Sequence, residues 1–381
     1  MSNISVNTIT DALGGSTASI NGLTPQASNM QPHNLIINGA MTVAQRGTSV
    51  AGLGNGDNGY HTIDRYRFSE SGSPTGEFTM SQSTDAPDGF GYSMKFDCTT
   101  ADTSMASGDR FQVSTRIEGQ NCQQLKYGTS DAQSLLLSFW VKSSKTGTYC
   151  IGVVQPDNGA ISFVREYTVS SANTWEYKTL TIDGDTSGVI SNGNGNGLEL
   201  GFALAAGTGF HSTAGTWTGS YEYATSNQAN LADSTSNTWQ ITGVQLEAGS
   251  TASSFAHENY GDTLRKCMRY YEKSYNQGVV PGTNTSVGTM SVYGGVTSAT
   301  TRFFGIPTYL VPKRASGVSI TFYTSTGTAG SISKYNASST TLPVASIGSG
   351  YGEYRIGAYI QTTGGDSTDP YVFHYTAESE L

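Results

Sequence analysis

The sequence predicts an all-β fold in which one short helix separates two β regions. The chain has 381 residues, of which 47 are glycine and only 13% are charged, and serine and threonine are abundant. This composition suits many short strands joined by tight turns. Apolar runs and turn signals recur at short intervals from Asn34 to His257, which is typical of a β-sandwich or a β-barrel.

Four segments follow from these patterns, and a chain of this length is expected to hold two or three domains. Residues 1–33 are polar and have no sustained period, so we expect an extended N-terminal arm for attachment or oligomerisation. Residues 34–257 make up the main β region, and residues 258–273 a boundary helix. Residues 274–381 then form a second, smaller β domain.

Three patterns define strands in the main region. The nearly continuous apolar run at 134–143 predicts a central strand, and the glycine-containing turn after it predicts a hairpin with 148–156. Residues 198–205 alternate, which predicts a strand with one buried face. The apolar phase slips by one residue at Thr242 and Gly243, where a β-bulge would restore the inward face.

The last third of the chain returns to strand patterns after the helix. We expect strands within 317–325, 352–362 and 371–379. In the second of these, one face would carry four residues: Tyr354, Ile356, Ala358 and Ile360.

The boundary helix has an apolar stripe and a basic remainder. Leu264, Cys267, Met268 and Tyr271 follow helical spacing, and Asp262 is placed to cap the N-terminus. Packing of this stripe against neighbouring sheets is the favoured interpretation; membrane and nucleic-acid binding are the alternatives.

Charge and length argue against both alternatives. The formal net charge is -9, which repels nucleic acid and anionic lipid. The longest apolar run is far shorter than the ~20 residues that span a bilayer, so we expect neither a nucleic-acid partner nor membrane insertion. We expect no metal site and no cofactor, because the four cysteines and five histidines lack metal-ligand spacing. Buried, reduced thiols made in a cytoplasm are the expected state of the cysteines.

Three stretches together resemble the bacteriophage tail-fibre and virion-appendage family. They are NLIINGAMTVAQRGTS with the downstream DRYRF, then LLLSFWVKSSKTGTY with TWEYKTLTI, and last ITGVQLEAGSTASSFAHENYGDTLRKCMRYYEK. The resemblance covers about Asn34 to Lys273, and the closing YTAESEL is similar to the ends of such proteins.

This resemblance implies a jelly-roll-like β-sandwich akin to carbohydrate-binding modules, on a virion appendage that is usually a homotrimer. The chain would be made in the host cytoplasm and would contact other virion or tail proteins through its N-terminal arm. Among the matched residues, we interpret Phe139, Trp140, Trp175 and Gln245 as scaffold.

The predicted function is non-enzymatic binding of a host-surface receptor, in particular a glycan. Trp217, Tyr221 and Tyr223 lie among turn-forming residues, where exposed rings can stack on a sugar. Alternatively, Tyr221 and Tyr223 share a strand face and belong to the core or to a subunit interface.

A polysaccharide depolymerase and a purely structural collar, nozzle or decoration component are the alternative functions. A depolymerase needs two carboxylates across the scissile bond. The candidates have no motif around them, so we assign no catalytic residue: Glu118, Glu166, Asp183 and Asp185.

Overall fold

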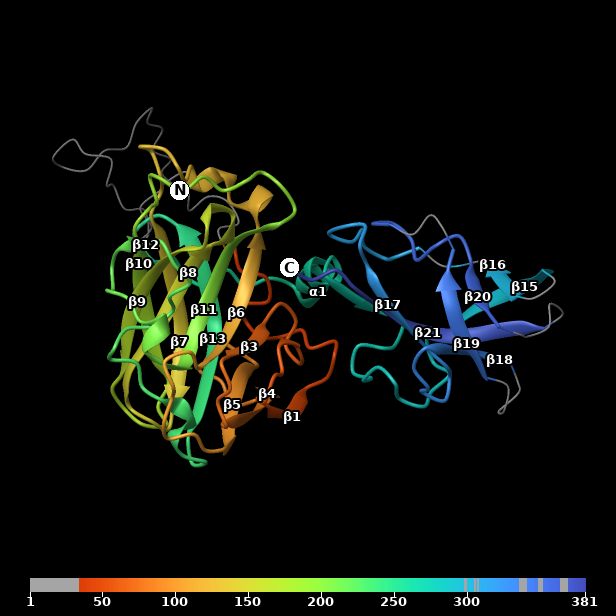
Figure 1. Ribbon diagram of the computed structural model, residues 1–381, viewed down its shortest axis with the longest axis horizontal. Coiled ribbons are helices and arrows are strands. Elements are labelled where there is room, and N and C mark those ends of the chain that lie inside the picture. The colour runs from red at the N-terminus through yellow and green to blue at the C-terminus, as the bar shows by residue number, and fades with distance from the viewer. Residues whose placement is uncertain are drawn as a thin grey trace, which may run out of the picture.

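The computed structural model describes most of the chain after the N-terminal arm. The described residues are 34–297, 300–304, 306, 308–335, 341–348, 352–363 and 369–381. The predicted arm, residues 1–33, lies outside them. Figure 1 shows a large β-sandwich beside a smaller β domain, with helix α1 between them.

Two antiparallel sheets form the sandwich, and the all-β prediction is confirmed. The six-stranded sheet has the order β1 (Ser49–Leu53), β4 (Glu77–Ser83), β5 (Ser93–Thr100), β13 (Thr238–Ala248), β7 (Leu135–Ser143), β10 (Glu176–Ile182). The seven-stranded sheet has the order β12 (Trp217–Thr218), β9 (Ile161–Val169), β8 (Gly147–Gln155), β11 (Asn196–Ala206), β6 (Arg110–Glu118), β3 (Arg67–Ser71), β2 (Gly59–Tyr60).

Aromatic side chains fill the space between the two sheets. Phe202 of the seven-stranded sheet lies 5.3 Å from Phe139 and 5.9 Å from Trp239, measured between ring centroids. All three side chains are fully buried. Phe139 is therefore scaffold, as the sequence predicted.

The predicted hairpin between 134–143 and 148–156 is wrong. Strand β7 pairs with β13 and β10, whereas β8 pairs with β9 and β11 in the opposite sheet. The turn residues permit a hairpin, but each strand finds its partners in a different sheet. A hydrogen bond of 3.1 Å between Ser143 Oγ and Tyr149 OH supports the corner where the chain crosses.

The predicted β-bulge in β13 is confirmed. Thr242 pairs with Trp140 and Gln245 pairs with Ser138, so β13 has one extra residue over this interval. Gly243 adopts a φ of 63°, a conformation that glycine reaches without a Cβ penalty.

Strand β11 is buried on both faces, although its alternation predicted one. The segment between β11 and β13 folds back over the outer face of the sheet. There Ala224 packs with Ala203, Cys150 and Val164 in a small apolar cluster. Small residues on this face admit the close approach of the covering segment.

A second, smaller β-structure follows α1. Its strands are β14 (Tyr271–Lys273), β15 (Met290–Thr297), β16 (Thr300–Phe304), β17 (Ser319–Tyr323), β18 (Ser331–Lys334), β19 (Thr341–Ile347), β20 (Ile360–Thr362) and β21 (Pro370–Glu378). The path runs β21-β15-β16-β20-β19-β18, and β18 pairs again with β21. The sheet therefore closes on itself around its own core.

Only the end of the strand predicted at 352–362 forms. Residues 360–362 are β20, and the preceding residues make bends with one isolated bridge between Thr308 and Arg355. Ile356 is fully buried, but Tyr354 is 67% exposed. The predicted common face of these side chains is therefore wrong.

Helix α1 spans Tyr260–Met268, shorter than the predicted helix. Asn259 occupies the N-cap position instead of Asp262, which lies in the first turn. Residues 271–273 form β14 because β21 offers them a backbone partner. No helix among the described residues is long and apolar enough to cross a membrane.

The helix packs on its neighbours, as the favoured interpretation predicted. Cys267 and Met268 are buried, whereas Arg265 and Lys266 are exposed. Just after the helix, Arg269 and Tyr270 bind the buried carboxylate of Glu118 in the sandwich. The helix therefore joins the two β-structures.

Candidate functional site

Trp217 lies in the short edge strand β12 and packs on the sandwich core. Its ring centroid is 5.8 Å from that of Tyr127 and 5.2 Å from that of Phe163. Its indole nitrogen donates a hydrogen bond of 2.9 Å to the backbone oxygen of Asp183. The side chain is half-buried, so part of the ring is already used in packing.

The two predicted tyrosines near Trp217 point into different environments. Tyr221 is 50% exposed, whereas Tyr223 is only 2% exposed. The guanidinium of Arg110 lies 4.5 Å from the Tyr223 ring centroid, and burial raises the pKa of Tyr223. The expectation that Tyr223 is exposed is wrong, and its burial agrees with the alternative that it belongs to the core. Residues 221–223 are not part of a strand, so the two tyrosines do not share a strand face.

A different aromatic surface lies on the outer face of the six-stranded sheet. Tyr177 of β10 and Trp140 of β7 stand directly opposite each other, with ring centroids 5.3 Å apart. Tyr177 is 45% exposed, and Trp140 is half-buried. This pair presents aromatic area to solvent.

Three further rings cluster beside this pair. Phe90 lies 5.0 Å from Phe255 and 5.2 Å from His257, and Phe255 lies 4.8 Å from His257. Phe90 and Phe255 are half-buried and His257 is exposed. The rings come from two segments distant in sequence, one before β5 and one after β13.

Gly243 brings the pair and the cluster together. A Cβ at this position would lie 2.7 Å from Phe90 Cζ and 3.2 Å from Trp140 Cδ1. The glycine of the bulge therefore leaves room for both rings above the same backbone. We call the resulting surface the aromatic strip, and its members are Tyr177, Trp140, Phe90, Phe255 and His257.

A polar cluster centred on Asp85 borders the aromatic strip. Lys142 Nζ donates to Asp85 Oδ2 at 2.6 Å, and Trp175 Nε1 donates to Asp85 Oδ1 at 3.1 Å. Gln240 Nε2 also lies 3.2 Å from Asp85 Oδ2. The hydrogen bond from Lys142 is the main cause that lowers the pKa of Asp85. The cluster supplies charged and amide groups suited to sugar hydroxyls.

The QLE stretch of β13 holds Phe255 in place. Gln245 Oε1 accepts a hydrogen bond of 2.8 Å from Ala256 N. The Glu247 carboxylate accepts bonds from the backbone nitrogen and hydroxyl of Ser253, at 3.0 and 2.8 Å. Gln245 is fully buried, so its predicted role as scaffold is confirmed.

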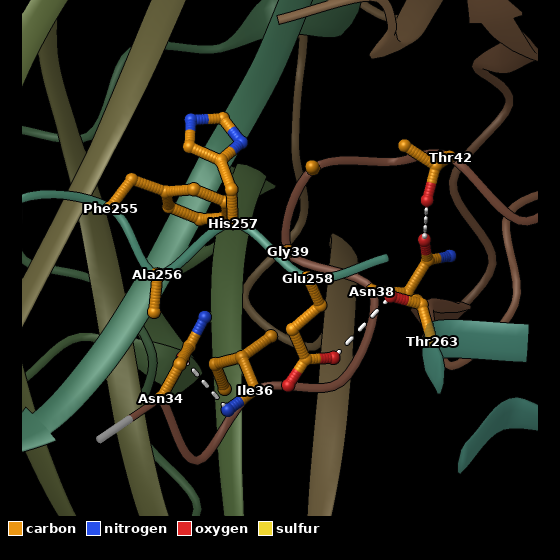
Figure 2. Close-up of a pocket in the computed structure, with 11 residues that line it drawn as sticks. Asn34, Ile36, Asn38, Gly39, Thr42, Phe255, Ala256, His257, Glu258 and Thr263 are labelled. Carbon is orange, nitrogen blue, oxygen red and sulfur yellow. Dashed lines mark hydrogen bonds between the residues drawn. The ribbon is translucent and has the colours of Figure 1, made fainter. Parts of the chain in front are cut away.

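A small pocket lies at the Phe255 end of the strip. Figure 2 shows His257 beside Phe255, with Glu258 and Asn34 near them. Its volume is about 70 Å³, enough for a small substituent but not for a sugar ring. Thr42 donates to Asn38 Oδ1 at 3.3 Å within the same wall.

The aromatic strip was not predicted from the sequence, because Trp140 was interpreted as scaffold together with Phe139. Leu137, Phe139 and Val141 of β7 face the core and are fully buried. Trp140 has the opposite phase on this strand, which places it on the outer face. That phase is the signal that could have separated it from the core residues.

Each of the four candidate carboxylates contacts different partner residues. Glu118 binds Arg269 and Tyr270, and Asp185 accepts a 2.7 Å hydrogen bond from Gln155. The other two have different partners: Glu166 binds Thr225 and Asn227, and Asp183 lies 4.0 Å from Arg165. In the described part of the chain, no three His, Cys, Asp or Glu side chains are grouped to hold a metal ion.

Comparison with known proteins finds likeness in solved structures. No family model and no curated protein matches the chain. A putative sugar-binding protein from Bacteroides thetaiotaomicron is 12% identical, covers 56% of this chain and 99% of its own, and has a TM-score of 0.31. The C-terminal family 22 carbohydrate-binding module of Clostridium thermocellum Xyn10B is 11% identical, with coverage of 55% and 98% and a TM-score of 0.28.

A phage protein is also among these neighbours. The enzymatically active domain of tailspike protein 4 from bacteriophage CBA120 is 13% identical, with a TM-score of 0.28. The match covers 52% of this chain but only 21% of the tailspike chain. The neighbours are thus carbohydrate-binding modules and a phage tailspike domain. Because the identities and TM-scores are low, the case for function rests on the chain's own residues.

Proposed function

We propose that this chain is a non-enzymatic bacteriophage virion appendage protein that binds a host-surface glycan through its aromatic strip. The main support for glycan binding is the aromatic strip. Five rings on one face are held by packing and hydrogen bonds, and a polar cluster lies beside them. Rings stack on the apolar faces of sugars, and the polar groups bind the hydroxyls.

The virion placement rests on the resemblance of residues 34–273 to tail-fibre and virion-appendage proteins. In this proposal the chain is made in the host cytoplasm, assembles as a homotrimer and contacts other tail proteins through residues 1–33. The absence of enzymatic activity is part of the proposal. It is supported by the separate structural contacts of Glu118 and Asp185.

Glycan binding is tested with fluorescently labelled full-length protein on a glycan array that includes host envelope polysaccharides. We expect binding that falls at least tenfold in Trp140→Ala and in Phe255→Ala, because each removes a stacking ring. Tyr354→Ala is the matched control, since Tyr354 is 67% exposed but lies in the smaller β domain. Unchanged binding in both strip variants would refute the site.

The non-enzymatic part has its own test. The purified protein is incubated with the polysaccharide that it binds, and released reducing ends are measured over time. We expect none above a boiled control. A steady release would favour the depolymerase alternative.

A further inference from the structure

Strands β5, β7 and β10 of the six-stranded sheet have one lysine each, and each of these lysines is already paired. Lys142 lies 2.6 Å from Asp85, Lys95 2.7 Å from Asp97, and Lys178 2.5 Å from Glu176. These distances join the ammonium nitrogen to the nearest carboxylate oxygen. No other lysine or arginine occurs in β5, β7, β10 or β13.

One lysine near the pocket end of the strip is also paired. Lys266 of α1 forms an ion pair with Glu258, which lines the pocket. The segments that supply Phe90 and Phe255, residues 84–92 and 250–258, contain no lysine or arginine. Lys142, Lys95 and Lys266 thus each have a carboxylate partner on the protein.

This arrangement disfavours acidic ligands. Proteins bind carboxylate and phosphate groups with lysine and arginine that are free to pair with them. An acidic sugar at the strip would have to displace Asp85 from Lys142, and the displaced carboxylate would remain nearby. The formal net charge of -9 adds a repulsive field at low ionic strength. An uncharged sugar meets neither cost.

The layout also sets a minimum ligand length. Tyr177 stands opposite Trp140, and Trp140 stands opposite Thr242. These residues form a row across three adjacent strands, which spans about 10 Å. The Phe90 cluster begins beyond this row, at Gly243. A ligand that touches both ends of the strip is therefore an oligosaccharide.

We propose that the aromatic strip selects uncharged, linear oligosaccharides over acidic ones, and that the paired lysines enforce this selection. This inference rests on the proposed function of the same site. Neutral sugar rings lie across β10, β7 and β13, with their hydroxyls near the Asp85 cluster. The Asp85–Lys142 pair acts as a filter because it engages Lys142, which lies two residues from Trp140 on β7.

The test uses a neutral oligosaccharide that binds on the array and its carboxymethylated derivative. Binding of the full-length protein is measured by isothermal titration calorimetry at low salt. We expect the neutral compound to bind at least tenfold more tightly. In Asp85→Asn, Lys142 loses its carboxylate partner, so the preference should shrink at least threefold. The matched control is Asp183→Asn, which frees Arg165 away from the strip and should leave the preference unchanged.

The possible outcomes distinguish a failure of the proposed preference for neutral sugars from a failure of glycan binding itself. Equal or tighter binding of the carboxymethylated compound, lost in Trp140→Ala, would overturn the selectivity and leave glycan binding intact. Absence of binding to every glycan would overturn the proposed function and this inference together. An unchanged preference in Asp85→Asn would remove the ion pair as its cause.

Discussion

The guanidinium carbon of Arg65 lies 3.4 Å from the ring centroid of Tyr270. Arg65 belongs to the DRYRF stretch of the sandwich and Tyr270 to the stretch after α1. Arg65 also forms an ion pair with Glu380 near the end of the chain. These stretches carried the resemblance to virion-appendage proteins, and the structure brings them together where the two β-structures meet. Some of the residues that carry the resemblance therefore lie at the interface between the two β-structures and not in a binding site.

The stability of this interface should depend on the buried carboxylate of Glu118. Glu118 Oε1 accepts hydrogen bonds from Arg269 Nε at 2.7 Å and from Tyr270 OH at 2.5 Å. Glu118→Ala would leave a charged and a polar group without a partner, so we expect a loss of about 3 kcal/mol in unfolding free energy. Urea denaturation measures it. Lys95→Ala, which breaks a surface pair, should cost less than about 1 kcal/mol; equal losses would contradict the proposed importance of burial.

Asp64 should make stability depend on pH. Burial raises its pKa to about 6, although its carboxylate accepts hydrogen bonds from the backbone and side-chain nitrogens of Gln45 at 2.8 and 2.6 Å. The folded state therefore holds the proton more tightly than the unfolded state. Stability from this group is full below pH ~4 and falls as pH rises to ~6, by about 3 kcal/mol.

Asp64→Asn isolates this contribution, because asparagine does not titrate. The difference in unfolding free energy, wild type minus variant, should fall between pH 4 and pH 6 and stay constant above. Urea denaturation at a series of pH values measures it. A difference independent of pH would show that the pKa of Asp64 is not raised by folding.

Trp217→Ala should destabilise the sandwich. The ring contacts Tyr127 and Phe163, and its nitrogen binds a backbone oxygen. For a half-buried tryptophan we expect a loss of about 2 kcal/mol, below the range for complete burial. Thermal and urea denaturation test this. A variant as stable as the wild type would indicate that packing does not depend on the Trp217 ring, and Trp217 would again be a candidate ligand-binding residue.

The trimer proposal is tested in solution. Multi-angle light scattering should give three times the 40.2 kDa chain mass for the full-length protein at micromolar concentration. A protein that starts at Asn34 tests the role of the arm, and dissociation of this variant would place the contacts there. A monomeric full-length protein would contradict the proposal for the isolated chain.

The sequence alone determined the fold class, because the patterns that predict strands involve residues close together in the chain. Alternation and apolar runs predicted β7 and β21, and the one-residue phase slip predicted the bulge at Gly243. Each of these signals comes from the two-residue period of a strand. The apolar stripe around Cys267 was also predicted from neighbouring residues, and Cys267 is buried as that stripe predicted.

Tertiary structure decided which strands pair and which rings meet. Strands β7 and β8 are neighbours in sequence but lie in different sheets, because their backbone partners are strands distant in sequence or in the opposite sheet. Residues 271–273 continue a helical pattern, yet pairing with β21 makes them a strand. The candidate site shows the same limit. Phe90 meets Trp140 above Gly243 and also contacts Phe255, because segments distant in sequence fold over one sheet. A sequence period assigns a side chain to a face, but contact between faces depends on long-range packing.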